Sequence, residues 1–506
     1  MKNKIKTSLI ALSAATAAVA QTEKPNVILI LADDLGWGDL SCYGANRVST
    51  PCVDNLANNG IRFTNAHAPA STSTPSRYGI LTGNYPFRKR GTDVAAGNAG
   101  MIISPDQYTL ADVFHNAGYQ TAAIGKWHLG LGSKTAEQDW NGTLDQTPND
   151  LGFGYHYIMA ATADRVPCVF VEQGRVVNYD PTAPIEVSYR KPFEGEPLGS
   201  TNPELLYNQK HSHGHDMAIV NGIGRIGYMK GGGKALWRDE DIADTLLASA
   251  TRFIDRSAAS NQPFFMYFCT NDVHVPRQPN ERFRGKSPMG LRGEAIMQFD
   301  WTIGRLTDKL KQLGIYDNTL IIITSDNGPA LDDGYQDMAE ELCGDHKPGG
   351  PYRGGKYSAF EAGNAIPFIV SWPAQVKGGK KSDALVSLID FVGSMNALAG
   401  GTLPAGHSAD SRNCIDTWLG RSKQPAPYHV SMAANRSLEI RTQRWKYIEP
   451  SQGGPMISWG PKIETGYLAT PQLYDMQKDI HEQKNQADSK PKIVSQMQAL
   501  LQEVRK

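Results

Sequence analysis

The sequence lacks net charge, paired cysteine motifs, repeats and long internal apolar runs. Its 51 basic residues balance 51 acidic residues, so no overall field attracts nucleic acid or a membrane surface. The six cysteines contain no CxxC spacing, and spacing alone leaves both disulfides and buried free thiols open. Beyond the first twenty residues no apolar run is long enough to span a bilayer. We therefore expect no nucleic-acid partner and no membrane anchor, and any affinity for anions must be local.

The N-terminus has the pattern of a secretory signal. A lysine-rich start precedes an apolar run from Leu9 to Ala20, which ends in an A-x-A site. Cleavage is predicted before Gln21, and no cysteine follows that could carry a lipid. Residues 1–20 are thus predicted to be a signal peptide, and the mature protein is predicted to be periplasmic or secreted.

The first candidate site in chain order is a pair of acids that follows an apolar run. Asn26 to Ala32 (NVILILA) predicts a central parallel strand buried on both faces, and Asp33 and Asp34 follow it directly. Adjacent buried acids are costly unless they bind something positive. The carboxyl ends of strands are also where open α/β sheets bind ligands.

A second apolar run ends in the same way. Thr319 to Thr324 (TLIIIT) predicts another buried strand, and it continues into Asp326 and Asn327. Two oxygen-bearing pairs at the ends of distant strands are more specific than either pair alone. Hard oxygen donors of this kind suit calcium or magnesium, so the sequence predicts one metal site at this edge of the sheet.

Basic side chains follow two further predicted strands. The strand Gln120 to Ile124 leads to Lys126 and His128, whose spacing on an extended segment predicts that both point to one side, toward a tetrahedral anion. The strand Pro263 to Cys269 leads to His274, a predicted general acid.

Two more basic residues lie beyond the predicted strand Thr319 to Thr324. Lys356 is predicted to make a second contact with the oxygens of that anion. Arg353 stands where outer hydroxyls of a substrate could be bound.

The segment from Ser71 to Gly83, STSTPSRYGILTG, carries the most specific motif. Ser73 is followed by Pro75-Ser76-Arg77 and later by Leu81-Thr82-Gly83. This order resembles the maturation signature of the type I sulfatases of the alkaline phosphatase superfamily, and the resemblance extends from Lys24 almost to the C-terminus. In those enzymes the first residue of the motif is oxidised to formylglycine. The hydrate of that aldehyde offers one hydroxyl to attack sulfur and a second to expel sulfate.

The resemblance implies a role for each predicted site residue. The family's calcium would be held by Asp33, Asp34, Asp326, Asn327 and the formylglycine at Ser73. Arg77 would stabilise the hydrate, Lys126 and Lys356 would hold sulfate oxygens, His128 would take a proton from the hydrate, and His274 would protonate the leaving oxygen. Ser73 is the serine form of the motif, which implies an anaerobic bacterium and an anaerobic sulfatase-maturating enzyme as a partner.

The implied activity is that of an exo-acting carbohydrate sulfatase. Its substrate would be a sulfated oligosaccharide, on galactose or N-acetylgalactosamine of mucin, glycosaminoglycan or algal glycans. Two alternatives remain open at this point. One is a phosphate or phosphonate ester hydrolase that uses unmodified Ser73, and the other is a non-catalytic protein that binds sulfated glycans.

The predicted fold is α/β, with a large mixed, mostly parallel sheet sandwiched by helices in the manner of alkaline phosphatase. Residues 21–405 are predicted to form the catalytic domain. Residues 406–506 are predicted to form a small subdomain with an antiparallel sheet and a closing helix. The loose, glycine-rich segment 141–234 is predicted to form loops over the active face. The histidines of HSHGH (211–215) could line a substrate cleft or bind a transition metal, but an exposed loop is the favoured interpretation.

Overall fold

A large mixed sheet forms the centre of the protein because several apolar runs of the chain are buried on both faces. The computed structural model describes residues 24–506. Within them the strand order is β14-β2-β13-β12-β1-β11-β3-β4-β5-β6, and β15 also pairs with β2. The strands of this sheet are β1 (Asn26–Ala32), β2 (Ile61–His67), β3 (Gln120–Lys126), β4 (Tyr155–Met159), β5 (Phe170–Glu172), β6 (Arg175–Val176), β11 (Phe264–Cys269), β12 (Thr319–Ser325), β13 (Ala365–Ser371), β14 (Lys380–Ser382) and β15 (Val386–Ser387).

The middle of the sheet is parallel. Strands β12, β1, β11, β3 and β4 run in the same direction, so their carboxyl ends meet at one edge. Strand β13 is antiparallel to β12 and β2, and β5 is antiparallel to β4. This arrangement confirms the predicted mixed, mostly parallel sheet. Strand β4 was missed in the sequence because its run YHYIM is short and contains a histidine.

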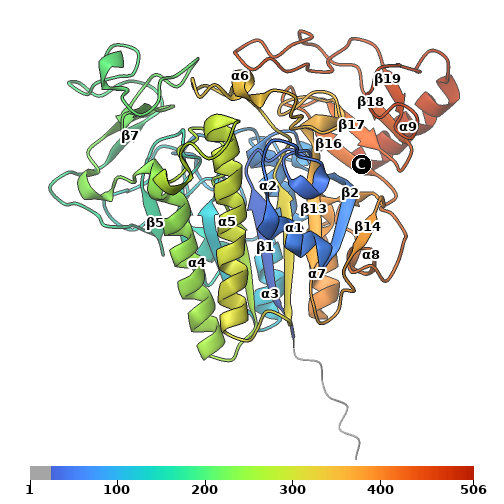
Figure 1. Cartoon of the computed structure of the whole chain (residues 1–506), viewed down its shortest axis with the longest axis horizontal. Coiled ribbons are helices and arrows are strands. Elements are labelled where there is room, and N and C mark those ends of the chain that lie inside the picture. The colour runs from blue at the N-terminus through green and yellow to red at the C-terminus, as the bar shows by residue number, and fades with distance from the viewer. Residues whose placement is uncertain (1–23) are drawn as a thin grey trace, which may run out of the picture.

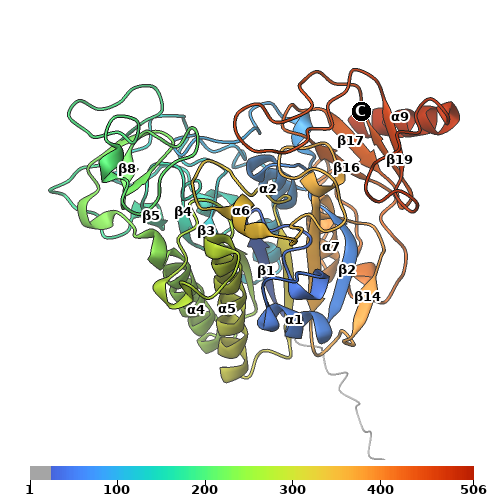
Figure 2. The ribbon, with the colours of Figure 1, turned by 45° about the horizontal axis from the view of Figure 1, so that its top comes forward.

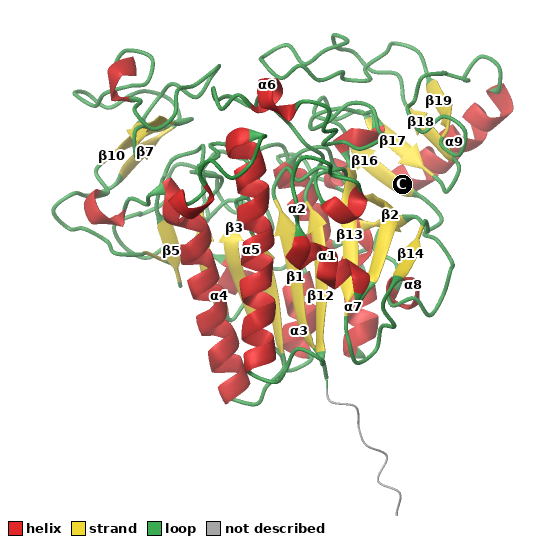
Figure 3. Ribbon diagram, in the orientation of Figure 1, coloured by secondary structure: helices red, strands yellow, loops and turns green. Residues whose placement is uncertain are grey.

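Helices cover both faces of the sheet (Figures 1 and 3). Helix α5 packs between α1 and α4 on one face, and α2, α3 and α7 contact one another on the other face. The helices are α1 (Pro51–Asn58), α2 (Ser73–Thr82), α3 (Leu110–Asn116), α4 (Ile242–Ala259), α5 (Gly290–Gln312), α6 (Ala339–Cys343), α7 (Phe391–Ala399), α8 (Ile415–Trp418) and α9 (Pro491–Arg505). None of the helices within residues 24–506 has the length and apolar run needed to cross a bilayer.

The C-terminal region forms a second, four-stranded antiparallel sheet, as predicted. Its strands are β16 (His429–Met432), β17 (Leu438–Arg441), β18 (Trp445–Ile448) and β19 (Gln472–Asp475). Helix α9 buries Met497 and Leu501 against this sheet. The sheet docks on the segment before α2, where the Ser71 N–H donates to the Met432 carbonyl at 3.0 Å. The boundary at residue 405 remains a prediction, and residues 1–20 lie outside the described part.

Loops and short strands from residues 141–234 stand over the carboxyl edge of the sheet, opposite the C-terminal region (Figure 2). They contain β7 (Glu186–Ser188), β8 (Ile219–Val220), β9 (Ile223–Gly224) and β10 (Tyr228–Lys230). The predicted exposure of HSHGH is wrong for His215, which is 7% exposed because it packs against Asp164 and Tyr335. All six cysteines have free thiols.

Candidate active site

The ends of four neighbouring strands bring the predicted residues together. Strand β1 delivers Asp33 and Asp34, while its neighbour β12 delivers Asp326 and Asn327. The Asp326 N–H donates to the Ala32 carbonyl at 3.2 Å, which keeps the two turns side by side. All four side chains are fully buried. The predicted oxygen cluster therefore exists as a unit, built at the edge where parallel strands end.

Helix α2 brings Ser73 and Arg77 to the same place. Ser73 is the first residue of the helix and Arg77 lies one turn on, so both side chains face the strand ends. Ser73 Oγ lies 3.5 Å from Asp33 Oδ1 and 3.4 Å from Asn327 Oδ1. Arg77 donates from Nε and Nη2 to Asp326 Oδ2, at 3.0 and 2.8 Å. Because Ser73 is the first residue of α2, the positive end of the helix dipole lies at Ser73, where it favours an anion.

Two buried lysines hold the acids from opposite sides. Lys126, the last residue of β3, donates to both oxygens of Asp33 at 2.6 and 2.7 Å and to Ser73 Oγ at 2.8 Å. Lys356 donates to Asp34 Oδ2 and to Asp333 Oδ2, each at 2.8 Å. Asp333 was missed in the sequence because a lone acid in an irregular segment gives no signal.

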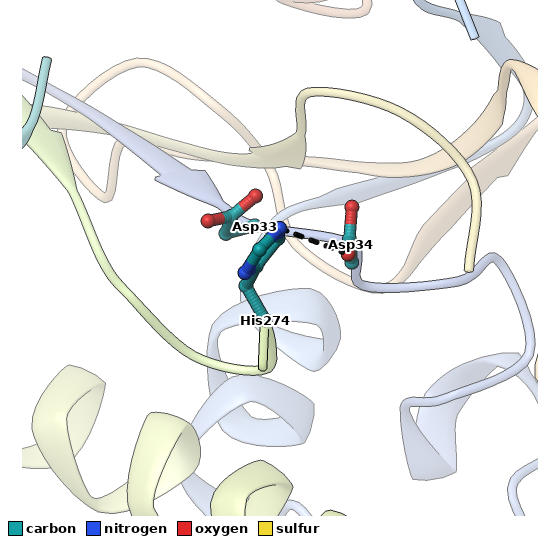
Figure 4. A group of neighbouring side chains, drawn as sticks. All are labelled: Asp33, Asp34 and His274. Atoms are coloured by element: carbon teal, nitrogen blue, oxygen red, sulfur yellow. Dashed lines mark ion pairs between the residues drawn. The ribbon is translucent and has the colours of Figure 1, made fainter. Parts of the chain in front are cut away.

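The donor set fits a divalent cation. Ligand atoms of Asp33, Asp34 and His274 lie within 4.8 Å of one another (Figure 4). Asn327 donates its Nδ2 to Asp34 Oδ1 at 2.7 Å, so its oxygen is left to face Ser73. Most of the donors are hard oxygens, the type that calcium and magnesium prefer. The buried acids Asp33, Asp34, Asp326 and Asp333 outnumber the buried bases Arg77, Lys126 and Lys356 by one, so the cluster alone is negative. A cation of two charges would make it net positive, which suits an anion.

A cavity of about 350 Å³ opens above this cluster. Ser73, His128, His274 and Lys356 all line it. His274 Nδ1 lies 2.6 Å from the Val275 carbonyl, and its Nε2 lies 3.7 Å from Asp34 Oδ2. His128 does not continue the strand after Lys126 but takes a positive φ of 57°, and its Nδ1 has no hydrogen-bond partner among the described residues.

Burial shifts the titration of these groups. Burial lowers the pKa of His128 well below its ordinary value, and the nearby charges of Lys126 and Arg165 add to the effect. The imidazole is therefore neutral and can accept a proton. Burial also lowers the pKa of Lys126, although the carboxylate of Asp33 opposes that change. Burial opposes ionisation of Asp333, but Lys356 and His274 outweigh it and lower the pKa of that carboxyl.

Arg353 lies elsewhere. Its guanidinium pairs with Glu464 at 2.6 and 2.8 Å and stacks on the Phe360 ring, and it does not line the cavity around Ser73. We therefore do not retain it as a substrate contact. The cavity instead contains residues that the sequence did not single out, namely Val94, Asp164, Arg165, Ile226, Asp333, Tyr357 and Trp459.

Comparisons with known proteins agree with this arrangement. A sulfatase family model matches residues 25–401. The chain is 50% identical over 484 residues to an N-acetylgalactosamine-6-O-sulfatase of Bacteroides thetaiotaomicron, covering 96% of this chain and 94% of that protein. It is 30% identical over 488 residues to human arylsulfatase A, covering 94% and 85%. A solved 6S-sulf protein from work on glycosaminoglycan metabolism by Bacteroides thetaiotaomicron superposes with a TM-score of 0.93, at 50% identity and 96% and 100% coverage.

Proposed function

This chain belongs to the sulfatase family, and from that premise we propose that it removes sulfate from the terminal sugar of sulfated glycans. The main support for this proposal is the cavity at the N-terminus of α2. Its lining includes Ser73, His128, His274 and Lys356, and a cluster of buried acids lies beneath it. A cavity of about 350 Å³ is of the size that binds small ligands, and exo action on one sulfated sugar is part of the proposal. The 50% identical relative supports N-acetylgalactosamine 6-sulfate as the substrate class.

The proposal includes formylglycine at Ser73 and one calcium ion. Formylglycine supplies a hydrated aldehyde as the nucleophile, and calcium supplies positive charge beside the sulfate. Asp33, Asp34, Asp326 and Asn327 would hold the ion together with the modified residue 73. Arg77 keeps Asp326 oriented through two N–H donors, which fixes that carboxylate relative to Ser73.

The remaining side chains can stabilise the developing charge and transfer protons. Lys126 and Lys356 place positive charge where negative charge builds on the sulfuryl oxygens, the kind of electrostatic stabilisation that dominates many enzymes. His274, at the cavity wall, would donate a proton to the departing sugar oxygen. His128, held neutral by burial, would accept a proton from the nucleophile.

The proposed setting is the periplasm or the exterior of an anaerobic bacterium, with an anaerobic maturating enzyme as the partner that oxidises Ser73. The predicted signal lies in residues 1–20, outside the described part of the chain.

The first test is peptide mass spectrometry across Ser73 after expression in an anaerobic host that carries the maturating enzyme. We expect a peptide lighter by two hydrogens that an aldehyde reagent traps. The same preparation should release sulfate from N-acetylgalactosamine 6-sulfate and not phosphate from the matching 6-phosphate. Unmodified serine, found beside a correctly matured control sulfatase, would instead favour a phosphohydrolase or a binding protein.

A further inference from the structure

A buried ion pair lines the cavity beyond the residues proposed to handle sulfate. Asp164 and Arg165 follow β4, whose end adjoins that of β3. Asp164 Oδ2 accepts from Arg165 Nη1 and lies 3.0 Å from both this atom and His215 Nε2. Its other oxygen accepts from the Thr162 hydroxyl. Asp164 is 2% exposed, so its carboxylate is fully occupied by the protein.

His215 is held in place on its other sides. Its Nδ1 lies 2.9 Å from the His213 carbonyl, and the Tyr335 ring packs on it with centroids 4.6 Å apart. Gly334 has a φ of 114°, and a Cβ there would lie 1.9 Å from His215 Nδ1. The glycine is therefore required for this packing, and His215 with Asp164 forms a rigid support for Arg165.

Arg165 has donors that the protein does not use. Within residues 24–506 its side chain donates only from Nη1, to Asp164 and, at 3.5 Å, to the Thr162 hydroxyl. Its Nε and Nη2 have no protein acceptor there, and the side chain is 17% exposed at the cavity wall. A guanidinium fork with free N–H groups is suited to two neighbouring oxygen atoms of a ligand.

The opposite wall comes from the C-terminal region. Trp459 is 50% exposed, lines the cavity and packs edge-on against Tyr357, with centroids 5.3 Å apart. The next residue, Gly460, lies directly against the His213 ring. Two loops distant in sequence thus meet across the cavity, and an exposed indole remains between polar groups, as at many ligand sites.

We propose that Arg165 and Trp459 form a sugar subsite that determines the specificity of the enzyme. The inference rests on the proposed carbohydrate sulfatase function. Arg165 donates hydrogen bonds to hydroxyl or acetamido oxygens of the sugar whose sulfate meets Ser73, and Trp459 packs against the C–H face of the same ring. Asp164 is a positioning residue, because both of its oxygens are already bound by Thr162, Arg165 and His215. Its negative charge cancels that of Arg165, so the subsite takes uncharged acceptors and disfavours a second sulfate on the ring.

The kinetic test uses the matured full-length chain. We would measure kcat/KM for N-acetylgalactosamine 6-sulfate, for its 4,6-disulfate and for 4-nitrophenyl sulfate, which lacks the sugar. The variants are Arg165→Lys, Trp459→Ala and Asp164→Asn. The matched control is Arg282→Lys, since Arg282 also pairs with an aspartate, Asp244, but at the protein surface. Thermal denaturation reports whether each variant folds.

For Arg165→Lys we expect the ratio of sugar to aryl sulfate kcat/KM to fall about 10- to 100-fold, the usual effect of losing a hydrogen bond to a charged group. Trp459→Ala should lower the same ratio, and Asp164→Asn should raise KM for the sugar more than it lowers kcat. The wild type should prefer the monosulfate to the disulfate at least about tenfold. Arg282→Lys should leave all ratios as in the wild type.

Binding to the unmatured serine form gives a second measurement that needs no turnover. Calorimetry should show that Arg165→Lys weakens N-acetylgalactosamine 6-sulfate binding and affects inorganic sulfate binding less.

Three kinetic results would overturn the subsite: an equal loss of kcat/KM on sugar and aryl substrates, no loss on either, or a preference of the wild type for the disulfate. If the matured wild type cleaves aryl sulfate and no sulfated monosaccharide in a panel of positions and sugars, the carbohydrate function itself fails. That result is distinct from a failure of the subsite, which requires sugar hydrolysis without dependence on Arg165.

Discussion

The protein contains two groups of buried acidic and basic side chains, similar in composition but different in their surroundings. The active-site charge cluster consists of Asp33, Asp34, Asp326, Asp333, Arg77, Lys126 and Lys356. The interface charge cluster lies between the central sheet and the C-terminal sheet and consists of His67, Glu361, Glu439, Glu482, Arg441 and Lys446. Both contain at least three acids and at least two bases, and nearly all their side chains are buried.

The interface charge cluster is closed on all sides by protein. Lys446 Nζ lies 3.0 Å from Glu361 Oε2 and 3.0 Å from Glu482 Oε1, and Arg441 Nε donates to Glu361 Oε1 at 2.9 Å. The active-site charge cluster instead borders the cavity through Lys356, beside Ser73 and His274. Buried charge alone therefore does not identify a catalytic site. A neighbouring cavity with a nucleophile and unused donors does.

Substitutions at the cavity are therefore expected to lower activity rather than stability. We expect His274→Ala to lower kcat/KM for sulfated sugars about 100- to 10,000-fold, because the departing alkoxide needs a proton. Activated aryl sulfates, whose leaving groups need less help, should lose much less. Steady-state kinetics on both substrates would check this, and an equal loss on both would argue against the acid role.

At the interface charge cluster the corresponding change should act on stability. Lys446→Met leaves Glu361 and Glu482 buried without their shared cation, so we expect a loss of about 3–5 kcal/mol in the free energy of unfolding. Activity per folded molecule should stay close to that of the wild type. Denaturant titration and kinetics on the same preparation would decide. If Lys446→Met had normal stability but no activity, the proposed difference between the two clusters would be wrong.

Metal removal should affect only the active-site charge cluster. A ligand present at about 100 times its Kd stabilises the folded state by about 2.7 kcal/mol, so a chelator that strips the proposed calcium should lower Tm measurably. Asp326→Asn should abolish that shift, and Glu482→Gln at the interface should retain it. Thermal scans with and without added calcium provide the measurement. If calcium still raised the Tm of Asp326→Asn, the ion would have to bind at a site that does not include Asp326.

The two clusters also differ in how far they could be predicted from the sequence. Asp33 and Asp326 directly follow long apolar strands, so local pattern was enough to predict that they meet. The interface charge cluster has no such signal, because Glu361, Lys446 and Glu482 are isolated charges of a kind that is usually solvated. The pairing of Arg353 with Glu464 could not be predicted for the same reason, since Glu464 is supplied by a distant loop. Arg165 depends on β4, a strand too short to recognise.

The smallest expected effect is a pH dependence of stability at the interface charge cluster. Burial raises the pKa of Glu439 to about 8, and the neighbouring Glu361 and Glu482 add to the effect while Lys446 opposes it. Its Oε1 accepts from Asn364, but its Oε2 has no hydrogen-bond partner among the described residues, which favours the protonated form. Because the folded state keeps this proton where the unfolded state has lost it, stability falls as pH rises from about 4.5 to about 8.

Glu439→Gln keeps a neutral side chain of the same shape and should remove that fall. Burial raises the pKa of Glu482 to about 7 and lowers that of His67 to about 4, so above about pH 7 Glu439 dominates the cluster's titration. Between about pH 7 and about pH 8.5 the wild type should lose up to about 1.4 kcal/mol more stability than Glu439→Gln. Denaturant titrations at both pH values would measure the difference, with Glu503→Gln at the exposed C-terminus as the control. Parallel curves for wild type and Glu439→Gln would mean that Glu439 is ionised in the folded protein, and that the interface holds three carboxylates against two bases without a proton.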